Sequence, residues 1–310
     1  MRMMTDTSLA SPRSTNPFSG LMSGTTGPVI VVVLAILAIW YISAVILNTP
    51  FQKEMYERAS RDDVPVSQLV SDTLAQERPV LPAPHQVAIE IWKTTVEKKV
   101  TSKRSLVYHT GITLSSTLLG FLIGTTLGIL LAVGIVHSRV LDKSMMPWVI
   151  SSQTIPILAI APMIIVVLNA VGISGLLPKA MISTYLSFFP VTVGMVKGLR
   201  SPEVIHMDLM HTYSATRWQA FWKLRLPYAV PYLFTSMKIG MAASLVGAIV
   251  GELPTGAVAG LGARLLAGSY YGQTVQIWSA LLMAAFLAGA LVAFIGVMEK
   301  VVLKKMGMAQ

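Results

Sequence analysis

The 310-residue sequence contains no cysteine and few charged residues. The absence of cysteine excludes disulfides, thiolate metal sites and a cysteine nucleophile. Charged residues form only 12% of the chain, whereas a soluble domain usually contains about a quarter. Hydrophobic residues form 54% of the chain. These proportions exclude an ordinary soluble protein and indicate an integral membrane protein.

Several catalytic motifs are also absent. The sequence has no Gly-x-x-x-x-Gly-Lys-Ser/Thr loop to cradle ATP phosphates and no His-Glu-x-x-His zinc motif. His206 and His211 are five residues apart, so they would not share a helix face as metal ligands do. The expected membrane spans contain no paired carboxylates and no Ser/His/Asp arrangement. We therefore expect no catalytic residue, no metal site and no cofactor bound by this chain.

Six long apolar segments are each able to cross about 30 Å of hydrocarbon as a helix. A cleaved signal peptide is the alternative for the first, but that segment starts late and is too long. The third is too long for one upright helix, so we expect a helix over about Val149–Asn169, kinked by Pro156 and Pro162. The segments are Pro28–Leu47, Thr110–Val136, Met145–Ser174, Ala180–Val196, Leu233–Val250 (interrupted by Lys238) and Val275–Met298. The predicted fold class is an all-α integral membrane protein with six transmembrane helices.

Lysine and arginine in the short loops predict the orientation, because cytoplasmic loops carry the excess of positive charge. On this rule both termini are cytoplasmic, and the net charge of +10 mostly reflects topology. Lys98, Lys99, Lys103 and Arg104 contradict the rule, but they lie in a long outer loop where it weakens. Basic residues are spread over four loops, so no nucleic-acid partner is expected. The inward set is Arg2, Arg13, Arg139, Lys143, Lys197, Arg200, Arg217, Lys223, Arg225, Lys300, Lys304 and Lys305, against Lys179 and Arg264 outside.

The regions between the spans differ in composition. The N-terminal tail is rich in Ser, Thr, Pro and Gly, which predicts disorder. Val87–Val96 predicts an amphipathic helix lying in the outer membrane interface, with a solvated linker helix as the alternative. The predicted division is 1–27 cytoplasmic tail, 28–47 first span, 48–105 extracytoplasmic segment with the interfacial helix, 106–300 core of five spans containing a cytoplasmic loop at 197–231, and 301–310 cytoplasmic tail.

The cytoplasmic loop at 197–231 is too long for a turn and unusually aromatic. Its pattern predicts two short helices, with Pro227 and Pro231 stopping the second and restarting the chain as the fifth span. An exposed aromatic and basic surface of this kind predicts contact with a partner protein or with lipid headgroups. The aromatic residues are Tyr213, Trp218, Phe221, Trp222 and Tyr228.

The segment Asp208–Pro227, followed by Ala229-Val230-Pro231, resembles the EAA loop of permease subunits of binding-protein-dependent ABC importers. The resemblance extends from about Leu81 to Lys300 and is similar to the nitrate/sulfonate/taurine branch. Within that branch it looks closest to members assigned to thiamine-precursor pyrimidines or riboflavin. The other supporting motifs are Leu81–Val87, Ser152–Pro162, Phe188–Gly194, Gly198–Arg200 and Gly251–Leu253.

Three departures from the family pattern stand out. The acidic-Ala-Ala opening of the loop is Asp208-Leu209-Met210, and the Arg common early in the second span is Ser116. The family's loop glycine falls on Ser214. A left-handed turn between the two short helices would therefore require a positive φ at serine, which is unfavourable.

The resemblance implies a MetI-like, type I permease fold in a bacterial inner membrane. It implies a cytosolic ATPase dimer that holds ATP and Mg²⁺, a second permease copy (identical or not), an extracytoplasmic solute-binding protein and the lipid bilayer as partners. The loop would couple the permease to the ATPase. The expected coupling residues are Asp208, Tyr213, Ser214, Ala215, Arg217, Trp218, Phe221, Leu226 and Pro227. Packing of Phe221 and Trp222 on the chain's own helices is the alternative for these aromatics.

Residues of the translocation pathway are less distinct. Gln153 and Thr154 are candidates because Pro156 frees backbone carbonyls nearby, a pattern tolerated beside cavities. Ser187 is a further candidate, although small polar residues commonly pack helices instead. Glu252 is expected at the outer end of the fifth span, where a carboxylate is readily hydrated, as a gate or binding-protein contact. Snorkelling to the cytoplasmic surface accounts for Lys238.

Two other functions remain as alternatives. An ion-coupled secondary transporter would need buried acidic or histidine side chains in its spans, and the sequence predicts none there. A membrane scaffold or membrane-anchored enzyme would need a soluble domain, for which no segment is large enough. An importer permease is therefore the preferred reading.

Overall fold

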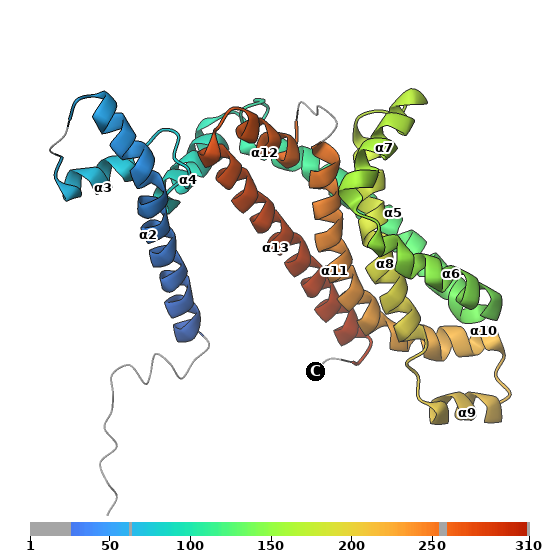
Figure 1. Ribbon diagram of the computed structural model, residues 1–310. Coiled ribbons are helices and arrows are strands. Elements are labelled where there is room, and N and C mark those ends of the chain that lie inside the picture. The colour runs from blue at the N-terminus through green and yellow to red at the C-terminus, as the bar shows by residue number, and fades with distance from the viewer. Residues whose placement is uncertain (1–25, 62–63, 254–258, 309–310) are drawn as a thin grey trace, which may run out of the picture. The chain divides into compact units, whose positions relative to one another are not determined.

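The computed structural model describes residues 26–61, 64–253 and 259–308 (Figure 1). Helices are the only regular secondary structure in these ranges, which confirms the all-α prediction. The chain divides into two compact units, residues 1–86 and 87–310. Each unit is described by itself.

The first unit is built on α2 (Thr26–Arg58), which pairs with α3 (Val66–Leu74). Helix α2 continues past the predicted end of the first span at Leu47. Asn48 lies on this extension and is buried, with its amide donating to the Leu81 carbonyl at 2.8 Å and accepting from the Val80 N–H at 2.7 Å. The Asn48 side chain thus provides hydrogen-bond partners for the backbone at Val80 and Leu81.

Within its described residues, the second unit contains four long helices and several short ones. Its elements are α4 (Pro84–Trp92, which begins in the first unit), the π-helical turn η1 (Lys93–Glu97), α5 (Leu106–His137), α6 (Arg139–Ser151), the 3₁₀ turn η2 (Ser152–Thr154), α7 (Ile157–Ala170), α8 (Leu176–Leu199), α9 (Val204–Thr212), α10 (Arg217–Ala220), the π turn η3 (Phe221–Arg225), α11 (Leu226–Glu252), α12 (Leu261–Tyr270) and α13 (Thr274–Lys305).

Five helical segments are long and apolar enough to span a membrane, and the bent pair α6 and α7 would make a sixth. The single kinked helix predicted over Val149–Asn169 is wrong, because α6–η2 and α7 meet at 102°. Pro156 accounts for the break, since it lacks an N–H for the Ser152 carbonyl; that carbonyl accepts a hydrogen bond from the Tyr185 hydroxyl instead. Pro162 lies inside α7 without breaking it.

Helix α8 packs between α5 and α11 through small residues. A Cβ added at Gly120 on α5 would lie 2.2 Å from the Ser183 Cβ on α8, so only glycine permits this approach. Hydroxyl groups join the three helices: Ser183 donates to the Ser244 carbonyl at 2.8 Å, and Ser244 donates to the Thr117 carbonyl at 2.8 Å. Small residues and interhelical hydrogen bonds of this kind hold membrane helices together.

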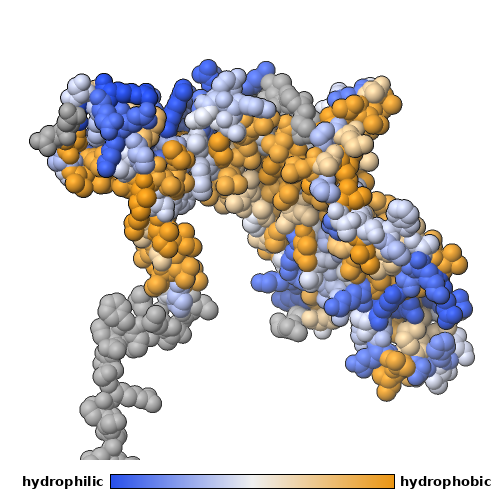
Figure 2. Space-filling model, viewed as in Figure 1, coloured by the Kyte–Doolittle hydropathy of each residue, from blue (hydrophilic) through white to orange (hydrophobic). Residues whose placement is uncertain are grey.

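Apolar side chains cover much of the outer surface of the spanning helices (Figure 2). Helix α4 and η1 bear out the predicted helix near Val87–Val96, with Val87 buried and Ile89, Trp92 and Val96 exposed. Its location in the membrane interface stays a prediction. Polar side chains gather near α12 and near α9 and α10, at opposite ends of the second unit (Figures 1 and 2).

Candidate functional site

The loop between α8 and α11 forms a helical hairpin at one end of the second unit (Figure 1). Helix α9 leads into a turn at Tyr213–Thr216, and α10 then runs back toward the spanning helices. The C-terminal end of α13 lies at the same end of the unit, in agreement with the predicted sidedness of this loop. Helix α9 matches the first of the two short helices predicted from the sequence.

The turn between α9 and α10 depends on a left-handed residue at Ser214. Its φ is 51°, the conformation that the sequence analysis considered unfavourable for serine. The N–H of Ser214 donates to the His211 carbonyl at 2.9 Å, and that of Ala215 donates to the Met210 carbonyl at 2.9 Å. This is the hydrogen-bond pattern of a Schellman motif, which ends a helix with a left-handed residue. The serine therefore adopts the glycine geometry.

Helix α10 begins with a capping box that the sequence analysis missed. The Gln219 N–H donates to the Thr216 hydroxyl at 3.3 Å, and the Thr216 N–H donates to the Gln219 side-chain oxygen at 2.9 Å. The signal was present in the sequence as Thr-x-x-Gln. Together with the turn at Ser214, it determines where the second arm of the hairpin starts.

The prediction that Pro227 and Pro231 stop the second short helix is wrong. Residues Arg217–Glu252 form one continuous helical segment through α10, η3 and α11. The Leu226 N–H bonds to the Phe221 carbonyl, five residues back, so the helix is widened directly ahead of Pro227. A π turn at this point accommodates the proline ring and its missing N–H. The second arm of the hairpin is consequently continuous with a membrane span.

The aromatic residues of the loop separate into buried and exposed groups. Phe221 is only 6% exposed and packs with Ile135 and Met195 in a core shared by α5, α8 and η3. By contrast, Tyr213 is 76% exposed and Trp218 is 68% exposed. The burial of Phe221 shows that it anchors the loop, as the packing alternative held, whereas Trp222 is exposed. Leu226 and Pro227 lie partly buried where the loop enters α11.

A contact between His206 and Tyr228 also holds the hairpin. The Tyr228 hydroxyl lies 3.3 Å from the His206 Nδ1, and the two rings are 5.7 Å apart. This contact joins α9 to the start of α11. The sequence analysis considered His206 only as a metal ligand and gave it no structural role.

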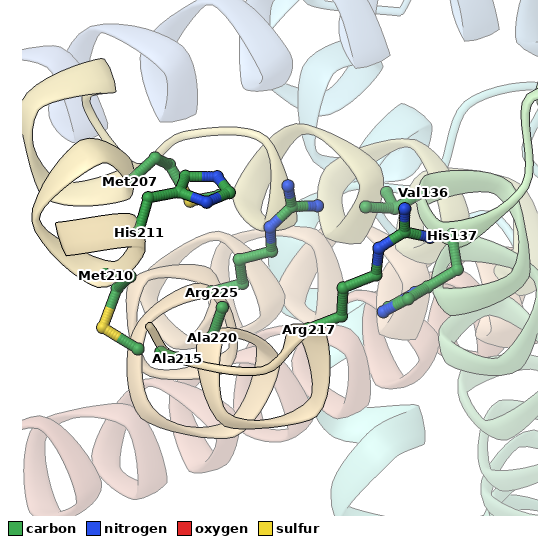
Figure 3. A pocket seen from close by; sticks show the side chains of 9 residues that line it. All are labelled: Val136, His137, Met207, Met210, His211, Ala215, Arg217, Ala220 and Arg225. Carbon is green, nitrogen blue, oxygen red and sulfur yellow. The ribbon is translucent and has the colours of Figure 1, made fainter. Parts of the chain in front are cut away.

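A pocket of about 360 Å³ lies between the hairpin and the end of α5 (Figure 3). Arg217 and Arg225 extend into it from α10 and η3, and His211 faces them from α9. Asp208, the acidic opening residue of the loop, is exposed and does not line it. The full lining is Val136, His137, Met207, Met210, His211, Ala215, Arg217, Ala220 and Arg225. The loop thus presents a basic pocket beside its exposed aromatic residues.

At the opposite end of α11, Glu252 lies in a buried polar cluster. The sequence analysis expected a carboxylate readily hydrated at the outer end of the span, but Glu252 is 0% exposed. Thr113 donates a hydrogen bond toward its carboxylate, with distances of 2.9 and 3.0 Å to the two oxygens. The Gly262 N–H donates to the same carboxylate at 2.8 Å. The side chain is thus enclosed by its own chain, and its role as a gate or binding-protein contact stays a prediction.

His109 completes this cluster, and the sequence analysis did not identify it. Its Nδ1 accepts a hydrogen bond from the Gly260 N–H at 3.0 Å, so its Nε2 carries the proton and donates to the Lys103 carbonyl at 3.0 Å. Gly260 has a φ of 129°, and a Cβ there would lie 2.2 Å from the Glu252 Cδ. Residues from α5, α11 and the start of α12 meet here. We call Glu252, Thr113, His109, Gly260 and Gly262 the outer cluster.

Of two basic residues that were expected in short outer loops, Lys179 is buried and Arg264 is partly buried. The Lys179 ammonium donates to the Ala259 carbonyl at 3.3 Å. Arg264 lies 3.7 Å from Glu90. Burial lowers the pKa of the Arg264 guanidinium and Glu90 raises it, but arginine stays charged at any physiological pH.

The remaining pathway candidates lie in two different environments. Gln153, Thr154 and Pro156 are exposed at the break between η2 and α7. Ser187 is buried, and its hydroxyl contacts the Thr184 and Gly120 carbonyls at 3.2 and 3.4 Å. Ser187 thus lies in the contact between α5 and α8.

Lys238 forms an ion pair with Glu299 of α13. Snorkelling of Lys238 to the surface is therefore not needed to explain its position in α11. The pair joins two spanning helices, and both side chains are largely shielded from solvent.

Comparison with known proteins agrees with this architecture. Residues 124–308 match the family described as "Binding-protein-dependent transport system inner membrane component". The chain belongs to this family. It is an ABC importer permease, a membrane subunit of MetI-like type.

Three relatives illustrate the range of solutes in the family. The permease is 31% identical over 225 residues to the riboflavin transport system permease protein RibX of Chloroflexus aurantiacus, covering 73% of this chain and 80% of that protein. It is 30% identical to the formylaminopyrimidine transport permease protein ThiX of Halalkalibacterium halodurans, covering 59% and 68%. It is 23% identical to the putative aliphatic sulfonates transport permease protein SsuC of Bacillus subtilis, covering 73% and 78%.

Proposed function

We propose that this permease forms half of the translocation pathway of an ATP-driven importer and works with a separate ATPase dimer. A second permease copy forms the other half, and an extracytoplasmic binding protein delivers the solute. The observation that carries this proposal is the helical hairpin between α8 and α11, which is continuous with a membrane span through η3. Movement of a bound ATPase would be transmitted directly to α11.

ATP binding is assigned to the partner because the sequence has no phosphate-binding loop of its own. ATP-driven closure of the ATPase dimer would favour one of two permease conformations through its different contacts with each. The exposed residues Tyr213, Trp218 and Arg217 are the proposed contacts. Both termini are proposed to be cytoplasmic, on the side of this hairpin.

The pathway is proposed to pass the break in the third span. Gln153, Thr154 and Pro156 are exposed there, where the 3₁₀ turn η2 gives way to α7. Broken helices at membrane depth are tolerated where they line a cavity or are covered by protein. Ser187 and Glu252 are proposed to hold the helices around this pathway rather than to contact the solute.

The proposed solute is a small heterocycle of the pyrimidine or flavin type. The support is the naming of RibX and ThiX for riboflavin and formylaminopyrimidine, at 31% and 30% identity. Sulfonate and nitrate are the competing solutes, as the relative SsuC and a permease named for nitrate import are less similar, at 23% and 24% identity.

Uptake by reconstituted vesicles tests the proposal. The complete complex is inserted into liposomes with its binding protein, and radiolabelled riboflavin, pyrimidine, sulfonate or nitrate is supplied at the binding-protein side. Accumulation should require ATP at the ATPase side and be abolished when the ATPase is omitted. Uptake driven by an ion gradient without the ATPase would contradict the importer mechanism and favour a secondary transporter.

A further inference from the structure

The pocket beside the coupling hairpin concentrates positive charge without any acidic counterpart. Its lining contains two arginines and two histidines but no aspartate or glutamate. Within the described ranges, neither Arg217 nor Arg225 makes an ion pair or a side-chain hydrogen bond. Guanidinium groups that converge on one cavity are well suited to a carboxylate or phosphate, which they bind in a bidentate manner.

The π turn η3 brings the two arginines together. Arg217 and Arg225 are eight residues apart, which in an α-helix would place them about 80° apart around the axis. A π turn contains about one residue more than an α turn, so the two side chains return to nearly the same face. Figure 3 shows both guanidinium groups extending to the same side of the helix, toward His137 and His211. The widened turn therefore has a consequence beyond accommodating Pro227.

We propose that this pocket receives a carboxylate side chain of the partner ATPase. The inference rests on the proposed function, because it names the chemistry by which the hairpin contacts that partner. Met207, Met210 and Ala220 form apolar walls that suit the aliphatic stem of a glutamate or aspartate.

Helix ends of both polarities lie at the pocket. Helix α5 ends at His137 and α9 ends at Thr212, whereas α10 begins at Arg217. The C-terminal ends carry a partial negative charge and the N-terminal end a partial positive charge, so their effects on an anion oppose one another. The two arginines therefore supply the main attraction for a carboxylate.

Three single substitutions, each of which removes one positive charge, test the pocket. Arg217→Gln and Arg225→Gln remove a lining cation, whereas Lys223→Gln removes an exposed cation of the same turn that does not line the pocket. Each variant is purified with the ATPase that accompanies the wild-type permease, and the dissociation constant is measured at two salt concentrations. We expect each arginine variant to bind roughly tenfold or more weakly, and Lys223→Gln to change binding less than about twofold.

A chemical crosslink identifies the group in the pocket. Arg225→Lys keeps the charge and supplies a primary amine, which a zero-length carbodiimide joins to a carboxylate in direct contact. Mass spectrometry should find a crosslink from position 225 to an acidic residue of the ATPase, and no such crosslink at that position in the wild type. Crosslinks at Lys223 serve as the internal control for exposed amines.

Several outcomes would overturn the assignment. Equal weakening by all three glutamine variants would show a general charge effect, and unchanged binding in all three would remove the pocket from the interface. If Arg225→Gln instead lowers retention of phosphatidylglycerol by the purified permease while ATPase binding is unchanged, the pocket serves a lipid headgroup. Failure of the wild-type permease to bind any ATPase would contradict the proposed function itself.

Discussion

Arg217 and Glu252 are the first and last residues of one continuous helical segment, yet their surroundings are opposite. Glu252 is fully buried and is held by Thr113 and the Gly262 N–H. Arg217 is exposed, lines an open pocket and has no counter-charge among the described residues. A buried polar side chain held by hydrogen bonds fixes a geometry, whereas an unpaired exposed charge remains available to a partner. The Glu252 end of this segment is thus built for rigidity, and the Arg217 end leaves its charge unpaired.

The largest expected effect concerns the outer cluster. Glu252→Ala removes the acceptor for the Thr113 hydroxyl and the Gly262 N–H. Leaving such groups buried without partners costs about 3–5 kcal/mol. We expect the free energy of unfolding, measured by denaturant titration in detergent micelles, to fall by this amount.

The matched control is the ion pair between Asp142 and Arg200, which is 2.9 Å long and partly exposed. Asp142→Asn should change the free energy of unfolding by less than about 1 kcal/mol, because exposed pairs contribute little. Equal effects of the two substitutions would remove the distinction between the buried and exposed charges. Glu252→Gln keeps the shape of the side chain and should fall between the two.

The next effect separates packing from contact within the hairpin. Phe221→Ala removes a buried ring from the core around Ile135 and should lower the free energy of unfolding by about 3 kcal/mol. Trp218→Ala removes a largely exposed ring and should change stability by less than about 1 kcal/mol. Only Trp218→Ala should leave a stable permease that retains less ATPase on co-purification. Normal ATPase retention by this variant would contradict the assignment of Trp218 as a contact.

A smaller effect concerns the backbone of the outer cluster. Gly260→Ala places a Cβ 2.2 Å from the Glu252 Cδ at a φ of 129°. Strain of this kind costs about 1–3 kcal/mol, so we expect a loss of about 2 kcal/mol in unfolding experiments. Gly289→Ala is the control, because a Cβ there meets nothing within 4 Å and alanine favours a helix. If Gly260→Ala is as stable as Gly289→Ala, the cluster is less rigid than its geometry indicates.

Much of this architecture could be predicted from local patterns. Apolar runs locate the spans, Pro156 marks the break in the third, and the aromatic loop marks the hairpin. These features depend on residues close together in the sequence. Even there, the rule that prolines end helices failed at Pro227, because a π turn preceding it changes the local geometry.

The outer cluster could not be predicted in the same way. Glu252 follows an apolar run in the sequence. An exposed carboxylate at the end of a span would give the same sequence pattern. Its burial depends on Thr113, which lies on a different helix, and on Gly260 and Gly262 beyond the end of α11. Such long-range contacts leave no periodic signal in the sequence. The same reason explains why His109 was missed.

The smallest predicted effect is at the turn of the coupling hairpin. Ser214 adopts a φ of 51°, which is unfavourable for a residue with a Cβ. Ser214→Gly should therefore raise the free energy of unfolding by up to about 1 kcal/mol. The gain is reduced because glycine has more conformational entropy in the unfolded chain. Ser144→Gly, on an exposed position inside α6, should lower it by about 0.5–1 kcal/mol. A loss of stability in Ser214→Gly would show that the serine side chain itself stabilises the turn. The hairpin turn would then depend on specific side-chain contacts, as the outer cluster does.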